Sequence, residues 1–168
     1  MIRAYLDSST FVKQFSEEKG SEVAHKLFIA CESGEIELIT SQWTIGESIA
    51  AMDRKFKRNE ITEEGRDITV TTLIDESERL AKKQSLIVVP LNEKVISASW
   101  PYITSNHLSA DDALHLLSFI MTTSEAFLVS DKYLLETIRK EGIDGYNIED
   151  ENDAIKVIKM LEERSGYK

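Results

Sequence analysis

The sequence contains few of the residues that interrupt regular structure. Seven glycines and two prolines occur in 168 residues, and no Gly/Ser linker, internal repeat or low-complexity tract divides the chain. This length is sufficient for one domain with a sizeable core and is short for two. We therefore predict a single domain over residues 1–168 with mostly regular secondary structure.

Missing features also indicate where the protein works. The single Cys31 cannot form an internal disulfide, and its helical surroundings favour a small buried apolar residue over a nucleophile. No apolar run approaches the ~20 residues needed to cross a bilayer. The first ten residues carry one Arg and one Asp without an apolar stretch, which is unlike a signal peptide. We expect a cytoplasmic protein that does not associate with membranes.

Several common catalytic motifs are absent. Neither GxGxxG nor GxxxxGK[ST] occurs, so the sequence offers no glycine-rich cradle for nucleotide phosphates. The three histidines, His25, His107 and His115, do not show zinc-binding spacing. We expect Trp43 and Trp100 to be core anchors or half-buried surface aromatics.

The charge balance is strongly acidic. Thirty acidic and twenty basic residues give a net charge of -10, whereas a sequence-reading DNA-binding module usually has a basic footprint. An enzyme that acts on nucleic acid is not excluded, because cations bound by carboxylates reverse the local field. A basic cluster at Arg54, Lys55, Lys57 and Arg58 is interpreted as a solvated helix face.

Hydrophobic patterning predicts strands that alternate with helices. Short apolar runs indicate strands, and longer segments with apolar residues at helical spacing indicate helices between them. This alternation is typical of an α/β fold with a mostly parallel sheet covered by helices on both faces. We predict strands at 2–6, 36–39, 86–90 and 126–129, and helices at 8–15, 21–33, 41–57, 62–83, 92–99, 109–121, 131–141 and 150–163.

Two aspartates follow predicted strands. Asp7 comes directly after the first strand, and Asp131 follows the strand at 126–129 after a single Ser. In open parallel sheets the ligand site lies beyond the carboxyl ends of the strands, so both carboxylates should reach the same edge. The alternative is that each aspartate only caps the helix that follows it.

Asp112 lies in the helix predicted at 109–121. It shares a helix face with Leu116 and Phe119, which places its carboxylate in or beside the apolar stripe. Burying a carboxylate there is costly unless it is paired, hydrogen-bonded or bound to metal. Asp111 falls instead on the face of His115, which we interpret as the polar side.

Two further observations leave alternatives open. Ser109 stands three residues before Asp112, a capping-box spacing that would give Asp112 a structural role. Glu47 lies between Gly46 and Ala50, away from the apolar stripe of its helix, so periodicity predicts exposure. Its small neighbours leave room for a substrate or another element to approach.

These motifs, in this order, resemble those of the PIN-domain nucleases, specifically the VapC-like ribonuclease toxins. The resemblance extends from Tyr5 to about Ile143 and rests on Leu-Asp-Ser-Ser at 6–9, Gly-Glu at 46–47, Ala-Asp-Asp-Ala-Leu-His-Leu at 110–116 and Leu-Val-Ser-Asp-Lys at 128–132. The Asp-Ala-Leu-His-Leu run is the most specific part.

The resemblance implies a PIN-like three-layer sandwich whose acidic site consists of Asp7, Glu47, Asp112 and Asp131. Ser9 and Ser130 would orient this site, although relatives usually place a Ser or Thr two residues before the last acid, not directly beside it. The acids would hold Mg²⁺ or Mn²⁺, cations that prefer oxygen ligands.

The implied activity is metal-dependent hydrolysis of RNA that leaves a 5′-phosphate. The implied partners are a second copy of the chain in a homodimer and a small antitoxin that blocks the site, often with a basic side chain. One alternative is a non-catalytic RNA-binding or scaffolding module. Another is an aspartyl-phosphate phosphatase, which would need a second Asp at the position of Ser9.

Overall fold

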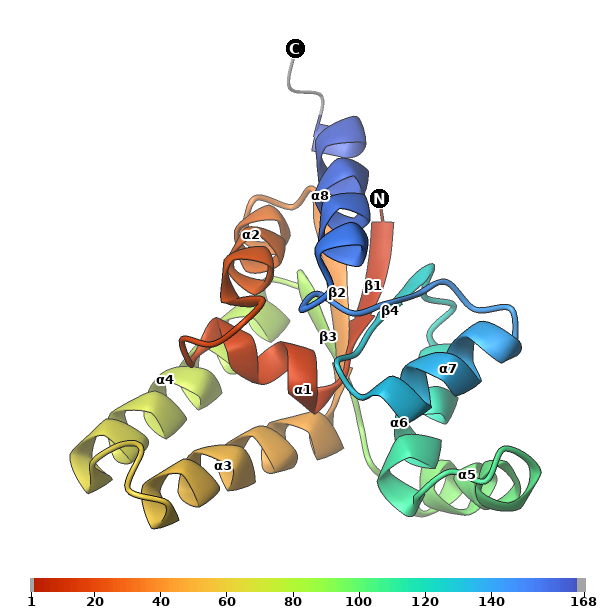
Figure 1. Cartoon of the computed structure of the whole chain (residues 1–168), viewed down its shortest axis with the longest axis horizontal. Coiled ribbons are helices and arrows are strands. Elements are labelled where there is room, and N and C mark those ends of the chain that lie inside the picture. Colours follow the sequence, from red (N-terminus) through yellow and green to blue (C-terminus); the bar gives the residue numbers. More distant parts are fainter. Residues whose placement is uncertain (1, 166–168) are drawn as a thin grey trace.

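Five parallel strands form one sheet in the computed structural model, which describes residues 2–165 and the side chains of residues 2–163 (Figure 1). The strand order is β3-β2-β1-β4-β5, and every neighbouring pair is parallel. The predicted α/β class is therefore confirmed. The strands are β1 (Ile2–Leu6), β2 (Ile36–Ser41), β3 (Leu86–Val89), β4 (Ala126–Leu128) and β5 (Gly145–Tyr146).

Helices flank the sheet on both faces, as the three-layer arrangement requires (Figure 1). None of the helices in residues 2–165 is long and apolar enough to cross a bilayer. The helices are α1 (Ser8–Phe11), the 3-10 helix η1 (Val12–Gln14), α2 (Ser21–Glu32), α3 (Gln42–Lys57), α4 (Glu63–Lys82), α5 (Glu93–Ser105), α6 (Ala110–Met121), α7 (Lys132–Lys140) and α8 (Glu151–Ser165).

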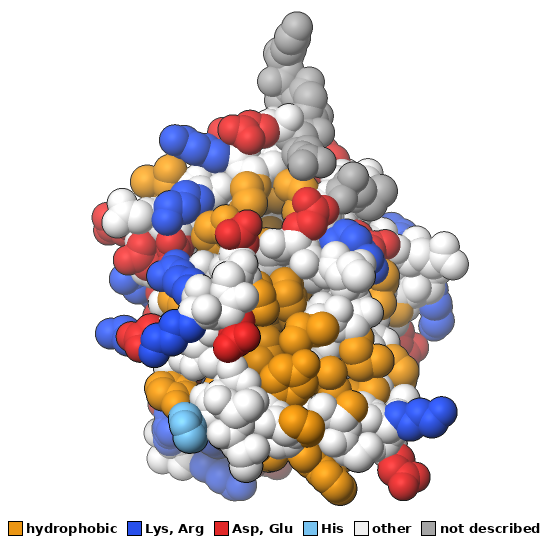
Figure 2. Space-filling model, turned by 90° about the vertical axis from the view of Figure 1, so that its right-hand side faces the viewer, with side chains coloured by type: hydrophobic (Ala, Val, Ile, Leu, Met, Phe, Trp, Pro, Cys, Tyr) orange, Lys and Arg blue, Asp and Glu red, His pale blue; other side chains and the backbone are white. Residues whose placement is uncertain are grey.

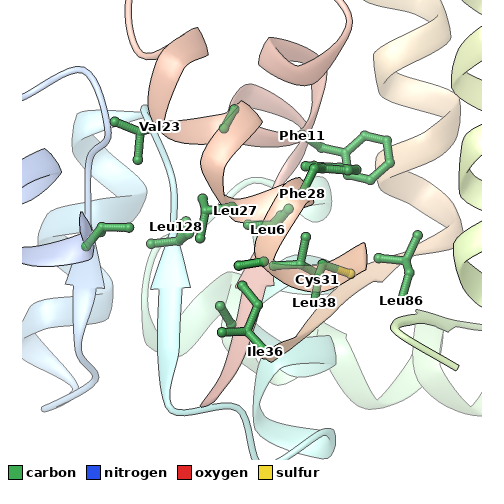
Figure 3. Packing of buried hydrophobic residues seen from close by; sticks show 14 of the residues in the cluster. Leu6, Phe11, Val23, Leu27, Phe28, Cys31, Ile36, Leu38, Leu86 and Leu128 are labelled. Atoms are coloured by element: carbon green, nitrogen blue, oxygen red, sulfur yellow. The ribbon is translucent and has the colours of Figure 1, made fainter. Parts of the chain in front are cut away.

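Side chains of successive strand residues enter two cores, one on each face of the sheet. In β1, Ala4 and Leu6 join the core that also contains Phe11 and Leu27, whereas Tyr5 joins the opposite core. Figure 3 shows the first core, where α2 packs its apolar stripe against the sheet. This alternation follows from the two-residue period of a strand, and it leaves β1 buried on both faces.

The second core is built around aromatic contacts between the sheet and α6. The ring of Tyr5 lies 4.9 Å from that of Phe127 and 6.3 Å from that of Phe119, centroid to centroid. Both distances are in the range of favourable aromatic pairs. These contacts fix the position of α6, the helix that carries Asp112, relative to the end of β1.

Three local predictions were wrong. Strand β5 was not predicted, because it has two residues and no apolar pattern. A Cβ at Gly145 would lie 2.9 Å from Leu135 Cδ1, so a larger residue there would force side chains of α7 to shift. Helix α5 continues through Pro101 to Ser105, since it packs along α6. Strand β3 is an edge strand, and Ile87 is only half-buried.

Candidate active site

The candidate site lies where the chain changes direction across the sheet. From the central strand β1 the chain proceeds to β2 and β3 on one side and later to β4 and β5 on the other. In open parallel sheets ligands bind beyond the carboxyl ends of the strands at such a switch point. Asp7 follows β1 directly, and Asp131 is the third residue after β4. The fold thus brings two of the predicted acids to adjacent strand ends.

Asp7 is held rigidly at the end of β1. Its side chain is 4% exposed, caps α1 by accepting from Thr10 N at 3.0 Å, and accepts from Ser9 Oγ at 2.7 Å (Oδ1) and 2.8 Å (Oδ2). Burial raises the pKa of Asp7 although His115, Ser9 and Thr10 each lower it. A nearby cation would stabilise the ionised form of this carboxylate.

Ser9 joins the ends of the two central strands. Its hydroxyl donates to Asp7 and accepts from the backbone N–H of Ser130 at 2.7 Å. Ser130 therefore enters the site through its backbone. The next residue, Asp131, caps α7 by accepting from Leu134 N at 2.8 Å. The helix-cap interpretation holds for both Asp7 and Asp131, but it leaves each carboxylate able to bind further groups.

Glu47 reaches the site through a histidine that our sequence analysis had not selected. Glu47 Oε2 lies 2.8 Å from Nε2 of His115, and Nδ1 of the same ring lies 3.0 Å from the Tyr5 hydroxyl. One hydrogen-bonded chain therefore joins β1, α6 and α3. Glu47 is half-buried, more enclosed than periodicity predicted, because α3 faces α6 at this point.

His115 is a buried imidazole among the acids. Burial alone would lower its pKa, but Tyr5, Glu47 and Asp7 together raise the pKa of His115 to about 10. An imidazolium can donate both N–H groups, one to Glu47 and one to the Tyr5 oxygen. We had assigned its helix face as the polar side, which is wrong, since His115 is 3% exposed. In the sequence, the burial of His115 was indicated only by its position three residues after Asp112 and between two leucines.

Asp112 occupies the first turn of α6. Its Oδ2 accepts from Ser109 Oγ at 2.8 Å, and its backbone N–H donates to the same hydroxyl at 3.2 Å, so Ser109 caps the helix as the alternative proposed. Burial raises the pKa of Asp112, Ser109 lowers it, and the charges of Asp111 and Asp131 raise it further. Asp112 therefore lies within electrostatic reach of Asp131.

The four acids form a connected cluster whose members are not gathered about one point. Ser9 links Asp7 to the backbone of Ser130, the residue before Asp131. Glu47 is bonded to His115, and Asp112 interacts with the charges of both His115 and Asp131. Within residues 2–163, no three His, Cys, Asp or Glu side chains are placed to hold one metal ion. The oxygen donors suit Mg²⁺ or Mn²⁺ in kind.

Searches for a matching family model and for a related curated protein found none. Solved structures do match. PAE2754 from Pyrobaculum aerophilum is similar over 99% of this chain and 91% of its own, with a TM-score of 0.62 and 13% identity. VapC20 from Mycobacterium tuberculosis, a sarcin-ricin loop cleaving toxin, is similar over 83% and 95%, with a TM-score of 0.58 and 12% identity.

A third match is FitAcB from Neisseria gonorrhoeae, with a TM-score of 0.58 and 11% identity over 86% of this chain and 97% of the other. The chain has a VapC-like PIN fold. In this fold Asp7 follows β1, Glu47 lies on α3, Asp112 lies on α6 and Asp131 lies at the β4–α7 junction. At these identities the likeness establishes the fold alone.

Proposed function

We propose that this protein is an endoribonuclease that depends on Mg²⁺ or Mn²⁺ and hydrolyses RNA phosphodiester bonds, leaving a 5′-phosphate. The proposal is supported by the positions of Asp7 and Asp131 after two neighbouring parallel strands, with Ser9 bonded to both strand ends, and by the bond between Glu47 and His115 of the helix that carries Asp112. One of the structural neighbours is a toxin that cleaves the sarcin-ricin loop, which supports RNA as the substrate class.

Each residue has a distinct part in this proposal. The four carboxylates would hold the cation, and the cation would neutralise charge on the phosphate and lower the pKa of an attacking water. Ser9 holds Asp7 by its hydroxyl, and His115 orients Glu47. Orienting contacts of this kind keep ligands in position and tune their basicity. Without a cation the cluster would repel the phosphates of RNA, so chelator should abolish cleavage.

The decisive test compares variants on single-stranded RNA with Mg²⁺ or Mn²⁺. Asp7→Asn should reduce cleavage more than about a hundredfold, and Asp112→Asn should do the same. Asparagine caps a helix as well as aspartate does, so the Asp7→Asn protein keeps its fold and separates catalysis from capping. Asp111→Asn is the matched control and should cleave like wild type. Equal cleavage by all four proteins would contradict the proposal.

The proposed partners follow from the same likeness. We propose that the protein is the toxin of a type II toxin–antitoxin pair, that a small antitoxin blocks the acids with a basic side chain, and that the chain forms a homodimer. FitAcB and VapC20 support the toxin–antitoxin assignment. A short neighbouring reading frame with a basic DNA-binding half would support the pairing further.

Two alternatives make different predictions. A non-catalytic RNA-binding module with this fold would bind RNA without cleaving it at high enzyme and metal concentration. A phosphatase that forms an aspartyl-phosphate would become labelled at Asp7 by a phosphate mimic. The second alternative is disfavoured because Ser9 occupies the position of the second Asp and donates to both Asp7 oxygens.

A further inference from the structure

The outward face of α3 carries an aromatic, an acidic, a small and a basic side chain in succession. Trp43, Glu47, Ala50 and Arg54 are spaced four, three and four residues apart, so they lie along one side of the helix, with Gly46 beside them. The opposite side of α3 packs inward against α1, α4 and β2. Because Glu47 belongs to the proposed catalytic site, this face of α3 is continuous with that site.

Trp43 exposes a large aromatic surface beside the acids. It is 39% exposed, which agrees with a half-buried surface aromatic and not with a core anchor, and it lies one helical turn before Glu47. Side chains four residues apart on a helix have Cβ atoms about 6 Å apart. A tryptophan left partly in water at this position can serve as a platform on which a base stacks.

Beyond Trp43 this face of α3 carries small residues. A Cβ added at Gly46 would meet no atom within 4 Å, and Ala50 is exposed, so no side chain obstructs an approach to this part of α3. This openness would admit a polymer but does not identify it. The kind of polymer is indicated by a positive charge at the far end of this face.

Arg54 supplies that charge. Of the basic cluster at 54–58, Lys55 pairs with Glu18 and Lys57 pairs with Asp53 at 2.6 Å, so these two cations are largely neutralised. Arg54 is exposed and forms no ion pair with any residue that the structure describes. It lies eleven residues from Trp43, about 16 Å along the helix axis. The cluster is thus more than a uniformly solvated face.

We propose that the outward face of α3 binds single-stranded RNA, with one base stacked on Trp43 and a phosphate of the same strand paired with Arg54. This proposal rests on the proposed function and specifies how its substrate is held. A single strand fits because its base faces are free, whereas those of a duplex are covered by neighbouring base pairs. The pairing of an indole surface with a guanidinium matches the alternation of bases and phosphates along the strand.

The first test measures binding alone, through tryptophan fluorescence. The chain has two tryptophans, so Trp100→Phe leaves Trp43 as the single reporter, and Trp43→Phe leaves Trp100 as the matched control. Both are combined with Asp7→Asn to keep the RNA uncut and titrated with a short single-stranded oligonucleotide in Mg²⁺. We expect saturable quenching of Trp43 and none of Trp100. Absence of quenching in the Trp43 reporter would overturn the proposal.

The second test uses cleavage kinetics in the otherwise wild-type chain. Trp43→Ala should raise KM roughly tenfold and leave kcat within about twofold, and Trp43→Phe should restore most of the loss because phenylalanine also stacks. Arg54→Gln should reduce the slope of log affinity against log salt by about 0.7, the value for one phosphate contact on a single strand. Unchanged KM in Trp43→Ala, or no rescue by phenylalanine, would overturn the proposal.

The two tests separate this inference from the proposed function. If wild type does not cleave RNA but the Trp43 reporter is quenched, the nuclease proposal fails and the RNA-binding face stands. If wild type cleaves RNA and Trp43 is not quenched, the catalytic site stands and the binding face fails. A protein partner on α3 would produce this second outcome.

Discussion

Ser9 is the residue whose hydroxyl connects most of the candidate site. One side-chain oxygen joins both oxygens of Asp7 to the backbone of Ser130, and thereby ties the end of β1 to the turn after β4. No other described side chain bonds to both oxygens of Asp7. The consequence is that Asp7 has a fixed orientation before any ligand arrives.

Ser9→Ala should therefore weaken metal binding and catalysis without unfolding the protein. We expect a loss of about ten- to a hundredfold in apparent metal affinity, the usual effect of removing a group that orients a ligand. Titration calorimetry with Mn²⁺ measures it. Ser9→Thr keeps the hydroxyl and should recover most of the affinity, and Ser8→Ala is the neighbouring control. An equal loss in Ser8→Ala would show that the effect is not specific to the hydroxyl.

Single residues were predictable from the sequence where their role depends on local position. Asp7 and Asp131 follow strands, and strand ends meet at one edge, so their approach could be foreseen. His115 could not, because its role depends on the simultaneous approach of Tyr5 and Glu47 from two other elements. For Trp43 the sequence left a core anchor and a half-buried surface aromatic open, because only the packing of α3 reveals which side of the helix faces water.

At the scale of elements, the C-terminal helix is attached by an ion-pair network at its first turn. Asp153 is 5% exposed and accepts from Arg139 of α7 at 2.5 Å, from Lys156 at 3.0 Å and from the backbone N–H of Asn147 at 3.1 Å. Burial alone would raise the pKa of Asp153, but these partners together lower it. The network holds α8, α7 and the segment after β5 together.

Asp153→Asn should lower the free energy of unfolding by about 2 kcal/mol at pH 7, because it removes charge-assisted hydrogen bonds from a buried group. The pKa of Asp153 is lowered in the folded state, so its stabilisation is complete above the unfolded pKa and disappears as the pH falls through the folded value. The difference between variant and wild type should therefore shrink in acid.

Urea unfolding at pH 7 and at pH 3 measures this difference. Glu151→Gln, in the same turn of α8, is the control and should unfold like wild type at both pH values. A destabilisation by Asp153→Asn that is equally large at pH 3 would mean that lost packing, and not the charge, is responsible.

The predicted elements agree with the structure where the apolar pattern is long and regular, as in α2, α3 and α6. They differ where neighbours decide the outcome. Strand β5 has two residues and exists because Gly145 and Tyr146 pair with β4, and α5 passes Pro101 because α6 packs along it. Such elements have almost no signal of their own, so local patterns could not reveal them.

At the scale of the whole molecule, one face is conspicuously apolar. Figure 2 shows hydrophobic side chains gathered over the lower part of the face where α5, α6 and α7 lie. These helices carry large exposed apolar residues, namely Ile96, Trp100, Ile120, Met121 and Tyr133. Contiguous apolar surface of this kind is typical of a protein interface, and it agrees with the homodimer that we propose.

Trp100→Glu should therefore weaken self-association by about 3 kcal/mol, since a carboxylate would be buried in an apolar interface. Light scattering during size-exclusion chromatography measures the oligomeric state. Ile68→Glu, at an equally exposed position on α4, should leave the dimer intact. The net charge of -10 also predicts a tighter dimer at higher salt, because screening reduces repulsion between the copies. A wild-type protein that is monomeric at all salt concentrations would contradict the prediction.

The strand order has a consequence for synthesis of the protein. Asp7 is made before Ser130 and Asp131, which are separated from it by more than 120 positions and reach it only when β4 adds beside β1. A nascent chain, or a product truncated before β4, thus carries its first acid without the amide and the carboxylate that complete the cluster. If the protein is a toxin, the ribosome making it is exposed to the finished site only after β4 and the start of α7 have been made.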